Sequence, residues 1–373
     1  MLQNRDIHPQ QLSVETLQEW LAADRPVTVL DIRTPEDRAE WFIPGSLHVN
    51  AYDALKAGEL DALQGVCLPK DRPVVAVCNI GKVSQIAAER LQERGFEALS
   101  LTGGMKAWSL AWNTAETKLE RATVLQVRRT GKGCLSYIIS SASEAVVIDS
   151  SVDPAVYLHL AAERGWTIRH VLDTHVHADH LSRSRALAEA AGARLSLPAQ
   201  NRVSFDFSPL QDGQQLEFGH SRITVMSTPG HTMESTCYQL DGEALFTGDT
   251  LFISGVGRPD LQASLDEARE RGRLLYRSLR RILDLPAQTL IFPGHVSDPP
   301  AFDRKPIAER LGRISAHIAE WLRSEDDFLA AILDRIPPAP LNFLSIVKLN
   351  EAGTMPEGDV TELEAGANRC AVS

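Results

Sequence analysis

The sequence THVHADH, residues 174–180, places three histidines and one aspartate within seven positions. Residues 169–172 before it predict a strand, and residues 182–191 after it have the apolar spacing of a helix. A loop between a strand end and a helix brings its side chains toward one point. Because neutral imidazole and carboxylate are donors that zinc, iron and manganese accept, the stretch predicts a metal site at the end of a strand.

Three later loops repeat this arrangement. His231, Asp249 and His295 each follow a glycine that comes after an apolar run. No cysteine falls at a ligand position of these loops, which argues against a structural thiolate zinc site. A purely structural alternative, with the first histidines hydrogen-bonded at a strand end, is weakened by these companions. The candidate ligands of the four loops are His175, His177, Asp179, His180, His231, Asp249 and His295.

The motifs HxHxDH (175–180), GH (230–231), GD (248–249) and GH (294–295) together resemble the metallo-β-lactamase superfamily. The resemblance covers about residues 120–300 and includes all five metal loops of that fold. It implies an αββα sandwich with the metals at one edge. From this resemblance we expect an α/β protein in which the catalytic domain follows a separate N-terminal domain.

Two kinds of member are compatible with these ligands. A thioester hydrolase of glyoxalase II type uses two zinc or iron ions, with Asp249 between them. The resemblance would assign His175, His177 and His231 to one ion, and Asp179, His180 and His295 to the other. Because the sequence contains all seven residues, counting ligands leaves the dinuclear hydrolase open.

The flanking sequence resembles the persulfide dioxygenases more closely. The similar stretches are THVHADHLS (174–182), PGHTMESTCY (229–238), TGDTLFISGVGRPDLQ (247–262) and NRC (368–370). This resemblance implies one Fe(II) per chain, held by His175, His231 and Asp249. The remaining four residues would orient these ligands or form a second metal site that is not used: His177, Asp179, His180 and His295.

Two imidazoles and one carboxylate on one face of an octahedral iron leave the opposite positions open, as in non-haem Fe(II) oxygenases. The expected reaction is oxidation of glutathione persulfide, or a similar small persulfide, by O2 to sulfite and a thiol. A hydrolase would instead need a metal-bound water of lowered pKa. The expected partners are therefore a small-molecule persulfide, glutathione and O2.

Arg258, in GVGRPD, is the candidate anchor for the substrate, because guanidinium binds carboxylates in a bidentate manner. A salt bridge at the surface is the alternative. Arg369 and Cys370 are placed near the site by the resemblance, although we expect Cys370 to be a mobile terminal thiol. Residues 337–373 contain prolines and have no clear helical pattern, which disfavours the hydrolase, since that enzyme needs a helical glutathione-binding tail.

The first third of the chain alternates short strands with amphipathic helices, for example strands at 74–77 and 98–101 around a helix at 84–94. This alternation predicts a parallel sheet with helices on both faces. A length of 373 residues exceeds one ordinary core. We therefore predict two domains, residues 1–116 and 117–373.

The stretch VCNIGKVS (77–84) places Cys78 at the start of a loop between a strand and a helix. Backbone N–H groups in such a loop, together with Lys82, stabilise a thiolate or persulfide anion. A buried cysteine at a strand end is the alternative interpretation.

Further motifs of this domain resemble the rhodanese family. They are DIR (31–33), IPGS (43–46) and GGMKAW (103–108), within about residues 5–112. The resemblance implies that Cys78 carries a persulfide in a six-residue loop that includes Gly81 and Lys82, with thiosulfate or sulfite as partners. This family often has arginine near the loop end, where the chain has Lys82 and Val83. A rhodanese module that is non-catalytic or regulatory is the alternative, whereas joining two active modules would keep a reactive persulfide at high effective concentration.

Composition excludes several other classes. The net charge of −11 disfavours nucleic acid as a partner. No apolar run approaches the roughly 20 residues that cross a bilayer, and the N-terminal residues do not resemble a secretory signal. The five cysteines include no CxxC pair, so we expect a reducing, cytoplasmic location, with a homo-oligomer possible.

Overall fold

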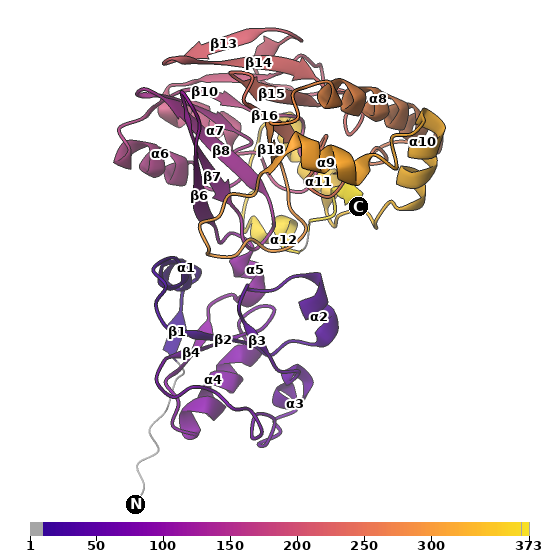
Figure 1. Cartoon of the computed structure of the whole chain (residues 1–373). Coiled ribbons are helices and arrows are strands. Elements are labelled where there is room, and N and C mark those ends of the chain that lie inside the picture. The colour runs from indigo at the N-terminus through magenta and orange to yellow at the C-terminus, as the bar shows by residue number, and fades with distance from the viewer. Residues whose placement is uncertain (1–9, 367, 373) are drawn as a thin grey trace, which may run out of the picture.

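The computed structural model describes residues 10–366 and 368–372. Residues 1–9, on which the expectation about a secretory signal rests, lie outside this description. Figure 1 shows an N-terminal domain below a larger C-terminal domain, joined through the neighbourhood of α5 (Gly104–Trp108).

The N-terminal domain is built on a five-stranded sheet of order β1-β5-β4-β2-β3, in which every pair is parallel. Its strands are β1 (Gln10–Leu12), β2 (Thr28–Asp31), β3 (Leu47–His48), β4 (Val74–Val77) and β5 (Ala98–Leu101). Its helices are α1 (Val14–Ala22), α2 (Pro35–Glu40), α3 (Tyr52–Lys56), α4 (Val83–Glu93) and α5. The predicted strands at 74–77 and 98–101 are confirmed.

Alternate residues of each central strand face opposite sides of this sheet. Val74 and Ala76 pack in one apolar cluster with Leu91 of α4, whereas Val75 and Val77 pack in another with residues of α1 and α5. Both faces are therefore covered, which explains the uninterrupted apolar run of β4. The predicted parallel sheet with helices on both faces is confirmed.

The predicted boundary between residues 116 and 117 falls inside a strand. β6 (Asn113–Lys118) pairs along its whole length with β7 (Thr123–Arg128) of the second domain. The sequence looked irregular at 112–120 because all residues of this edge strand except Ala115 are polar. We therefore place the boundary near residue 112.

The C-terminal domain contains two sheets. One has seven strands in the order β12-β11-β10-β9-β8-β7-β6, and the other has six in the order β13-β14-β15-β16-β18-β19. The strands not yet bounded are β8 (Leu135–Ser141), β9 (Glu144–Ile148), β10 (Thr167–Leu172), β11 (Arg194–Pro198), β12 (Ser208–Leu210), β13 (Gln215–Phe218), β14 (Ser221–Ser227), β15 (Thr236–Leu240), β16 (Ala244–Gly248), β18 (Leu290–Pro293) and β19 (Glu309–Arg310).

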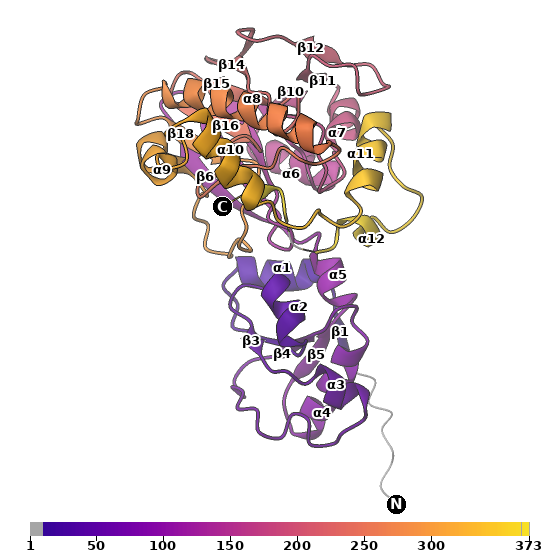
Figure 2. The ribbon, with the colours of Figure 1, turned by 90° about the vertical axis from the view of Figure 1, so that its right-hand side faces the viewer.

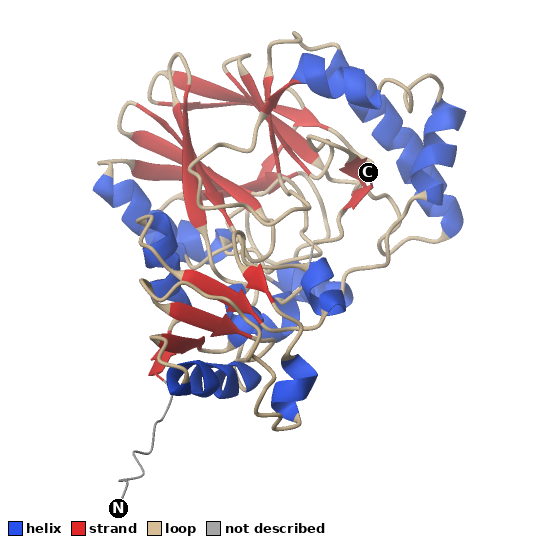
Figure 3. Ribbon diagram, turned by 60° about the horizontal axis from the view of Figure 1, so that its bottom comes forward, coloured by secondary structure: helices blue, strands red, loops and turns tan. Residues whose placement is uncertain are grey.

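The two sheets pack face to face with helices outside them, as Figure 3 shows. Tyr137 and Ile139 of β8 meet Tyr238 and Phe246 of the other sheet in the central core. The outer face of the larger sheet packs on α6 (Pro154–Glu163) and α7 (Ser184–Ala191). Each fully buried side chain of this kind contributes about 1.5–3 kcal/mol. The expected αββα sandwich is confirmed.

The outer face of the smaller sheet packs on α8 (Leu265–Leu283), α9 (Leu311–Ile318) and α10 (Glu325–Asp334). Two more helices follow, α11 (Phe343–Ala352) and α12 (Thr361–Glu364). The expectation of an irregular tail was therefore wrong, since helical residues stand beyond the prolines at 337–338, and the argument that it supplied against a hydrolase is lost.

The last described strand of the chain pairs with a strand more than 100 residues earlier in the sequence. β20 (Ala371–Val372) pairs antiparallel with β17 (Val256–Gly257). Figure 2 shows α12 on the side of the domain that faces the N-terminal domain, with α11 above it at the flank. In the part of the chain that the structure describes, no helix is long and apolar enough to span a bilayer.

Candidate metal centre

Four strand ends of the sandwich carry the candidate ligands. The loop 174–180 follows β10, and His231, Asp249 and His295 follow β14, β16 and β18. All seven predicted side chains are buried. The structure sorts them, together with three residues that the sequence did not single out, into three groups of neighbouring donor atoms.

The first donor group consists of His175, His231 and Asp249. Oδ2 of Asp249 lies 3.9 Å from Nε2 of His175 and 3.6 Å from Nε2 of His231. Nε2 of His175 and Oδ2 of Asp249 are buried and have no hydrogen-bond partner among the described residues. Buried polar atoms without partners are costly, so this convergence fits a bound cation.

The other ring nitrogens of the first donor group are held by hydrogen bonds. Nδ1 of His175 lies 2.9 Å from Oγ1 of Thr174, which donates to Oδ2 of Asp149 at 2.9 Å. Nδ1 of His231 lies 2.8 Å from the carbonyl oxygen of Arg258, to which it donates. Both rings therefore carry the proton on Nδ1 and present a lone pair on Nε2, as metal-binding histidines do.

Electrostatics favours the ligand forms of all three side chains. Burial and the neighbouring His177 lower the pKa of His175 well below its usual value, and burial lowers that of His231. Burial opposes ionisation of Asp249, but His295 outweighs this effect and lowers the pKa of the carboxyl. Two neutral imidazoles and a carboxylate suit iron, zinc or manganese.

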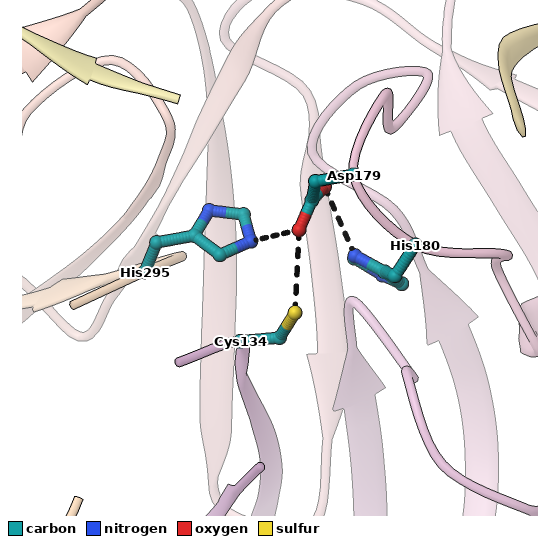
Figure 4. Close-up of side chains that lie close together, drawn as sticks. All are labelled: Cys134, Asp179, His180 and His295. Carbon is teal, nitrogen blue, oxygen red and sulfur yellow. Dashed lines mark hydrogen bonds and ion pairs between the residues drawn. The ribbon is translucent and has the colours of Figure 1, made fainter. Parts of the chain in front are cut away.

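The second donor group consists of Cys134, Asp179, His180 and His295 (Figure 4). The carboxylate of Asp179 is its centre, within 3.2 Å of Sγ of Cys134, 3.1 Å of Nδ1 of His180 and 2.7 Å of Nε2 of His295. Nδ1 of His295 lies 2.5 Å from Oδ1 of Asp249, which joins the two groups.

Cys134 was not singled out by the sequence analysis, but the structure places its thiol among the donor atoms of the second group. It stands at the turn before β8, far from the histidine motifs in sequence. An isolated bridge between Cys134 and His295 brings it to the site. Burial and the charge of Asp179 raise the thiol's pKa, but His180 and His295 outweigh them and lower it.

The third donor group, Asp149, Asp173 and His177, was not predicted as a unit. Nε2 of His177 lies 3.3 Å from Oδ1 of Asp149 and 4.0 Å from Oδ1 of Asp173. Thr174 donates its backbone N–H to one oxygen of Asp149 and its hydroxyl to the other. Asp173 accepts hydrogen bonds from Ser182 and Ser184. Hydrogen bonds thus satisfy both carboxylates. The ring of His177 lies 4.4 Å from that of His175, and neither of its nitrogens has a hydrogen-bond partner among the described residues.

A cavity of about 170 Å³ opens beside the second donor group. His295 forms part of its wall, together with Phe252 and Pro337 and with Asn368 and Arg369 from the end of the chain. Nδ2 of Asn368 donates to Asp179 at 3.0 Å. The resemblance had placed the final NRC residues near the site, and the structure brings them there.

Arg258 is not available as a substrate anchor. Its guanidinium is buried, donates to both oxygens of Asp260 at 2.8 Å, and also donates to the carbonyl oxygens of Pro338 and Arg369. These bonds hold the C-terminal segment in place and fix the carbonyl that orients His231. The alternative of a surface salt bridge was wrong too, because the ion pair is buried on the arginine side.

Cys370 is not a mobile terminal thiol. It is buried, and its carbonyl oxygen accepts a hydrogen bond from the backbone of Arg258. Burial and the nearby carboxylates of Asp179 and Asp249 raise the pKa of its thiol well above the usual value. A protonated thiol of this kind packs as a small apolar group.

In the N-terminal domain, Cys78 lies where the sequence placed it, between β4 and α4. Its side chain is fully buried, and Sγ lies 3.3 Å from the hydroxyl of Ser84, which is 2.8 Å from that of Ser100. Lys82 is exposed at the start of α4. The loop is therefore closed over the sulfur in this structure.

Gly81 and Gly104 allow the loop to approach α5. Both have positive φ, and a Cβ on Gly104 would lie 2.2 Å from the carbonyl oxygen of Cys78. Met105 and Lys106 donate their backbone N–H groups to the carbonyls of Cys78 and Asn79, each at 2.9 Å. Any larger residue at 104 would push the loop away from the helix.

Comparison with protein families places two known domains on the chain. The model of the rhodanese-like domain matches residues 13–111, and that of the metallo-beta-lactamase superfamily matches residues 129–295. The gap between the two matches contains β6, in agreement with a boundary near residue 112.

Among curated relatives, the hydroxyacylglutathione hydrolase of Rhizobium johnstonii is 34% identical over 146 residues, which cover 38% of this chain and 54% of the relative. The hydroxyacylglutathione hydrolase of Rhizobium etli is 33% identical over 183 residues, covering 47% of this chain and 68% of the relative. The chain thus spans about half of the first relative's length and two thirds of the second.

Two solved structures are similar over the C-terminal domain. A metallo-beta-lactamase from Staphylococcus aureus has a TM-score of 0.57 and 26% identity, covering 64% of this chain and 75% of that one. ETHE1 from Myxococcus xanthus has a TM-score of 0.55 and 29% identity, covering 62% of this chain and 99% of that one.

Proposed function

Because the chain belongs to the metallo-beta-lactamase superfamily and carries a rhodanese-like domain before it, we propose that it is a bifunctional enzyme of persulfide metabolism. The C-terminal domain would be an Fe(II)-dependent dioxygenase that oxidises glutathione persulfide or a similar small persulfide. The N-terminal domain would transfer sulfane sulfur through Cys78.

The position of His177 carries this proposal. A dinuclear hydrolase would use His175, His177 and His231 at one ion. The ring of His177 contacts that of His175 at 4.4 Å, but its donor nitrogen groups with Asp149 and Asp173 and not with His231 and Asp249. Two imidazoles and one carboxylate remain, the donor set of non-haem Fe(II) oxygenases. The other oxygen of Asp249, Oδ1, lies 2.5 Å from Nδ1 of His295 in the second donor group.

The chain's own residues would hold and orient the iron. Nε2 of His175, Nε2 of His231 and Oδ2 of Asp249 are the proposed ligand atoms. Thr174 and the carbonyl of Arg258 fix the two rings by their hydrogen bonds. Iron(II), when bound there, would supply the electron density that makes dioxygen reactive toward sulfur.

In the proposed reaction the outer sulfur of glutathione persulfide is oxidised to sulfite, and dioxygen is reduced. Both atoms of dioxygen and the oxygen of one water molecule end on that sulfur. The S–S bond breaks, the inner sulfur leaves as the glutathione thiol, and two protons are released. No general base is needed to activate a metal-bound water, unlike in a hydrolase.

The cavity beside His295 is the proposed substrate site. Arg369 lies in its wall, pairs with Glu40 of the N-terminal domain at 2.9 Å, and is partly exposed. An exposed guanidinium at a cavity mouth can exchange this carboxylate for one of the substrate. We therefore assign to Arg369 the anchoring role that the sequence analysis gave to Arg258.

The proposed transfer at Cys78 begins with its thiolate and thiosulfate. The sulfur attacks the outer sulfur of thiosulfate, the S–S bond of the donor breaks, and sulfite leaves with the electron pair. Glutathione thiolate would then take the sulfane sulfur and become glutathione persulfide. Because Cys78 is fully buried, the loop 79–82 must move to admit the donor.

A dinuclear hydrolase of glyoxalase II type is the second candidate. The curated relatives are hydroxyacylglutathione hydrolases, and the second donor group contains the residues of a second ion. In that case the rhodanese module would be non-catalytic or regulatory. The hydrolase would act on a glutathione thioester and would not consume oxygen.

Metal analysis and oxygen uptake separate these candidates. Protein purified without added metal should contain one iron per chain and should consume O2 when glutathione persulfide is added. Two metals per chain, no oxygen uptake and cleavage of a glutathione thioester would establish the hydrolase instead.

For the first domain, sulfur transfer from thiosulfate should be lost in Cys78→Ser. Cys67→Ser is the matched control, because Cys67 is exposed in the same domain. Equal transfer by the Cys78 variant and the unsubstituted chain would show that the module is not a sulfurtransferase.

A further inference from the structure

The C-terminal part of the chain, from α11 onward, contacts the backbone of the metal loop (residues 174–182). Nδ2 of Asn350, on α11, donates to the carbonyl oxygens of His177 and His180 at 2.8 and 2.9 Å. Its Oδ1 accepts from the backbone of Ser182 at 2.9 Å. The loop 175–182 therefore owes part of its shape to a helix more than 160 residues away in sequence.

Glu364, at the end of α12, makes a second attachment to the same loop. Its Oε1 accepts a hydrogen bond from the backbone N–H of Leu181 at 2.7 Å and from Nη2 of Arg183 at 3.3 Å. Oε2 lies 3.1 Å from Nη2 of Arg129. The glutamate and Arg129 are both fully buried, so the pair is shielded from water and salt.

Arg129 continues this connection into the N-terminal domain. Its Nε and Nη2 donate to the carbonyl oxygen of Ser109 at 3.1 and 2.8 Å, and Nη1 donates to that of Ser151 at 3.3 Å. Ser109 ends α5. One guanidinium thus joins the last turn of the first domain to the carboxylate that holds Leu181.

The other end of α5 contacts the Cys78 loop through the backbone of Met105 and Lys106. The side chain of Lys106 pairs with Asp359 and Glu362, which flank and belong to α12. Figures 1 and 2 both show α12 next to α5. Helix α12 therefore contacts the first domain on one side and the metal loop on the other.

The charge state of Glu364 makes this connection strong. Burial opposes its ionisation, but Arg129 and Arg183 outweigh burial and lower the pKa of the carboxyl. Removal of one partner of a buried ion pair leaves an uncompensated charge. The arginine can keep its partners only while the first domain stays docked, because two of its bonds go to Ser109.

We propose that Glu364 and Arg129 are positioning residues that make metal binding in the second domain depend on docking of the first. This inference rests on the proposed function only in taking the first donor group to hold a metal ion. Neither residue touches the proposed ligand atoms; they act on the loop that carries His175.

The first test is the affinity for Fe²⁺, measured by competition with a chelator on the full chain. Glu364→Gln should bind Fe²⁺ about 10–100-fold more weakly, the usual range when a residue that supports a metal ligand is lost. Glu357→Gln, an exposed glutamate in the same segment, is the control and should leave the affinity unchanged. Equal affinities of both variants would overturn the proposal.

Glu364→Gln can fail to fold, so Glu364→Asp is tested beside it. Aspartate keeps the charge but reaches less far, and we expect a smaller loss of Fe²⁺ affinity than with glutamine. Hydrogen exchange of the peptide 175–183 should be faster in either variant. Unchanged exchange and affinity in a folded Glu364→Asp would count against the positioning role.

The second test disturbs docking without touching a ligand. A Cβ at Gly131 would lie 2.1 Å from the carbonyl oxygen of Trp108 in the first domain, so Gly131→Ala must disturb the contact between this loop and the end of α5. Gly65→Ala is the control, because nothing lies within 4 Å of its added Cβ. We expect weaker Fe²⁺ binding in the first variant and unchanged binding in the second.

A double substitution then decides whether docking acts through the buried pair. If it does, Gly131→Ala combined with Glu364→Gln should weaken Fe²⁺ binding by less than the product of the single effects. If the double variant loses Fe²⁺ affinity by the full product of the two single effects, docking does not act through the buried pair and the proposal is overturned. Absence of Fe²⁺ binding in the unsubstituted chain would contradict the proposed function instead, so the two failures are distinguishable.

Discussion

The first and second donor groups lie side by side at one edge of the same sandwich, and both are buried. They differ in where their polar atoms point. In the first group, Nε2 of His175 and Oδ2 of Asp249 face each other without hydrogen-bond partners among the described residues. In the second group, the carboxylate of Asp179 is surrounded by groups that can donate to it, although Nε2 of His180 is also without a partner among the described residues.

This difference has an electrostatic counterpart. Burial lowers the pKa values of His175 and His231, and His177 lowers that of His175 further, which favours the neutral form of both rings. Burial also opposes protonation of His180, but Asp179 outweighs it and raises the pKa of His180 to about 10. A neutral pair of imidazoles is ready to bind a cation, whereas the second group already balances its carboxylate with protons.

The largest expected effect comes from removing a proposed ligand. His231→Ala takes one imidazole from the first donor group, and we expect iron content and oxygen uptake to fall by more than about 100-fold, beyond the range for residues that only support a ligand. Metal analysis by mass spectrometry measures this directly.

His180→Ala is its matched comparison, since it removes a buried imidazole of the second donor group. We expect the iron to remain. Loss of iron from this variant would mean that the two groups do not differ as described.

A smaller effect is expected where the two groups meet. His295→Ala removes the contact with Oδ1 of Asp249, and we expect Fe²⁺ affinity to decrease about 10–100-fold with one iron still bound at saturation. Titration of the apoprotein with Fe²⁺ gives both numbers. A decrease from two metals to one would instead identify His295 as a ligand of a second ion.

Thr174→Val tests the orientation of His175. Valine has nearly the same shape but cannot accept from Nδ1 of the ring or donate to Asp149, and about a 10-fold loss of Fe²⁺ affinity should follow. Thr232→Val provides the comparison. Thr232 is the neighbour of His231, and its hydroxyl lies within hydrogen-bond distance of that of Ser235. If both variants lose Fe²⁺ affinity to the same extent, Thr174 does not have a specific role in orienting His175.

The smallest effect is expected for Cys134→Ala. The thiol donates a hydrogen bond to Asp179 at 3.2 Å. It is connected to Asp249 of the first donor group only through Asp179 and His295. We therefore expect Fe²⁺ affinity to change by no more than about threefold, as for a single weak hydrogen bond. A loss of zinc or iron from this variant would show that the thiolate is a metal ligand.

The sequence determined the fold to a large extent. Runs such as those at 74–77 and 98–101 predicted strands because buried strands need side chains that face two packed layers. The glycines before His231, Asp249 and His295 indicated strand ends, and all four metal loops lie at such ends in the structure. Local patterns are sufficient here because strands and loops are decided mainly by neighbouring residues.

The sequence also determined the first donor group, but only through resemblance. Spacing in THVHADH does not distinguish His175 from His177. The structure distinguishes them because the donor nitrogen of His175 lies near His231 and Asp249, whereas that of His177 lies near Asp149 and Asp173. The same limit explains the error at Arg258. Whether a guanidinium is free depends on Asp260, Pro338 and Arg369, of which two come from the far end of the chain.

Only the tertiary structure decided which distant residues complete the site. Cys134 reaches it through a bridge to His295, and Asn350, Glu364 and Arg129 reach it through bonds across 50 or more positions of sequence. Such contacts leave no periodic signal, because each depends on one side chain meeting one backbone group. The sequence therefore determined what the metal loops contain, and the packing of the C-terminal segment and the first domain decided how those loops are held.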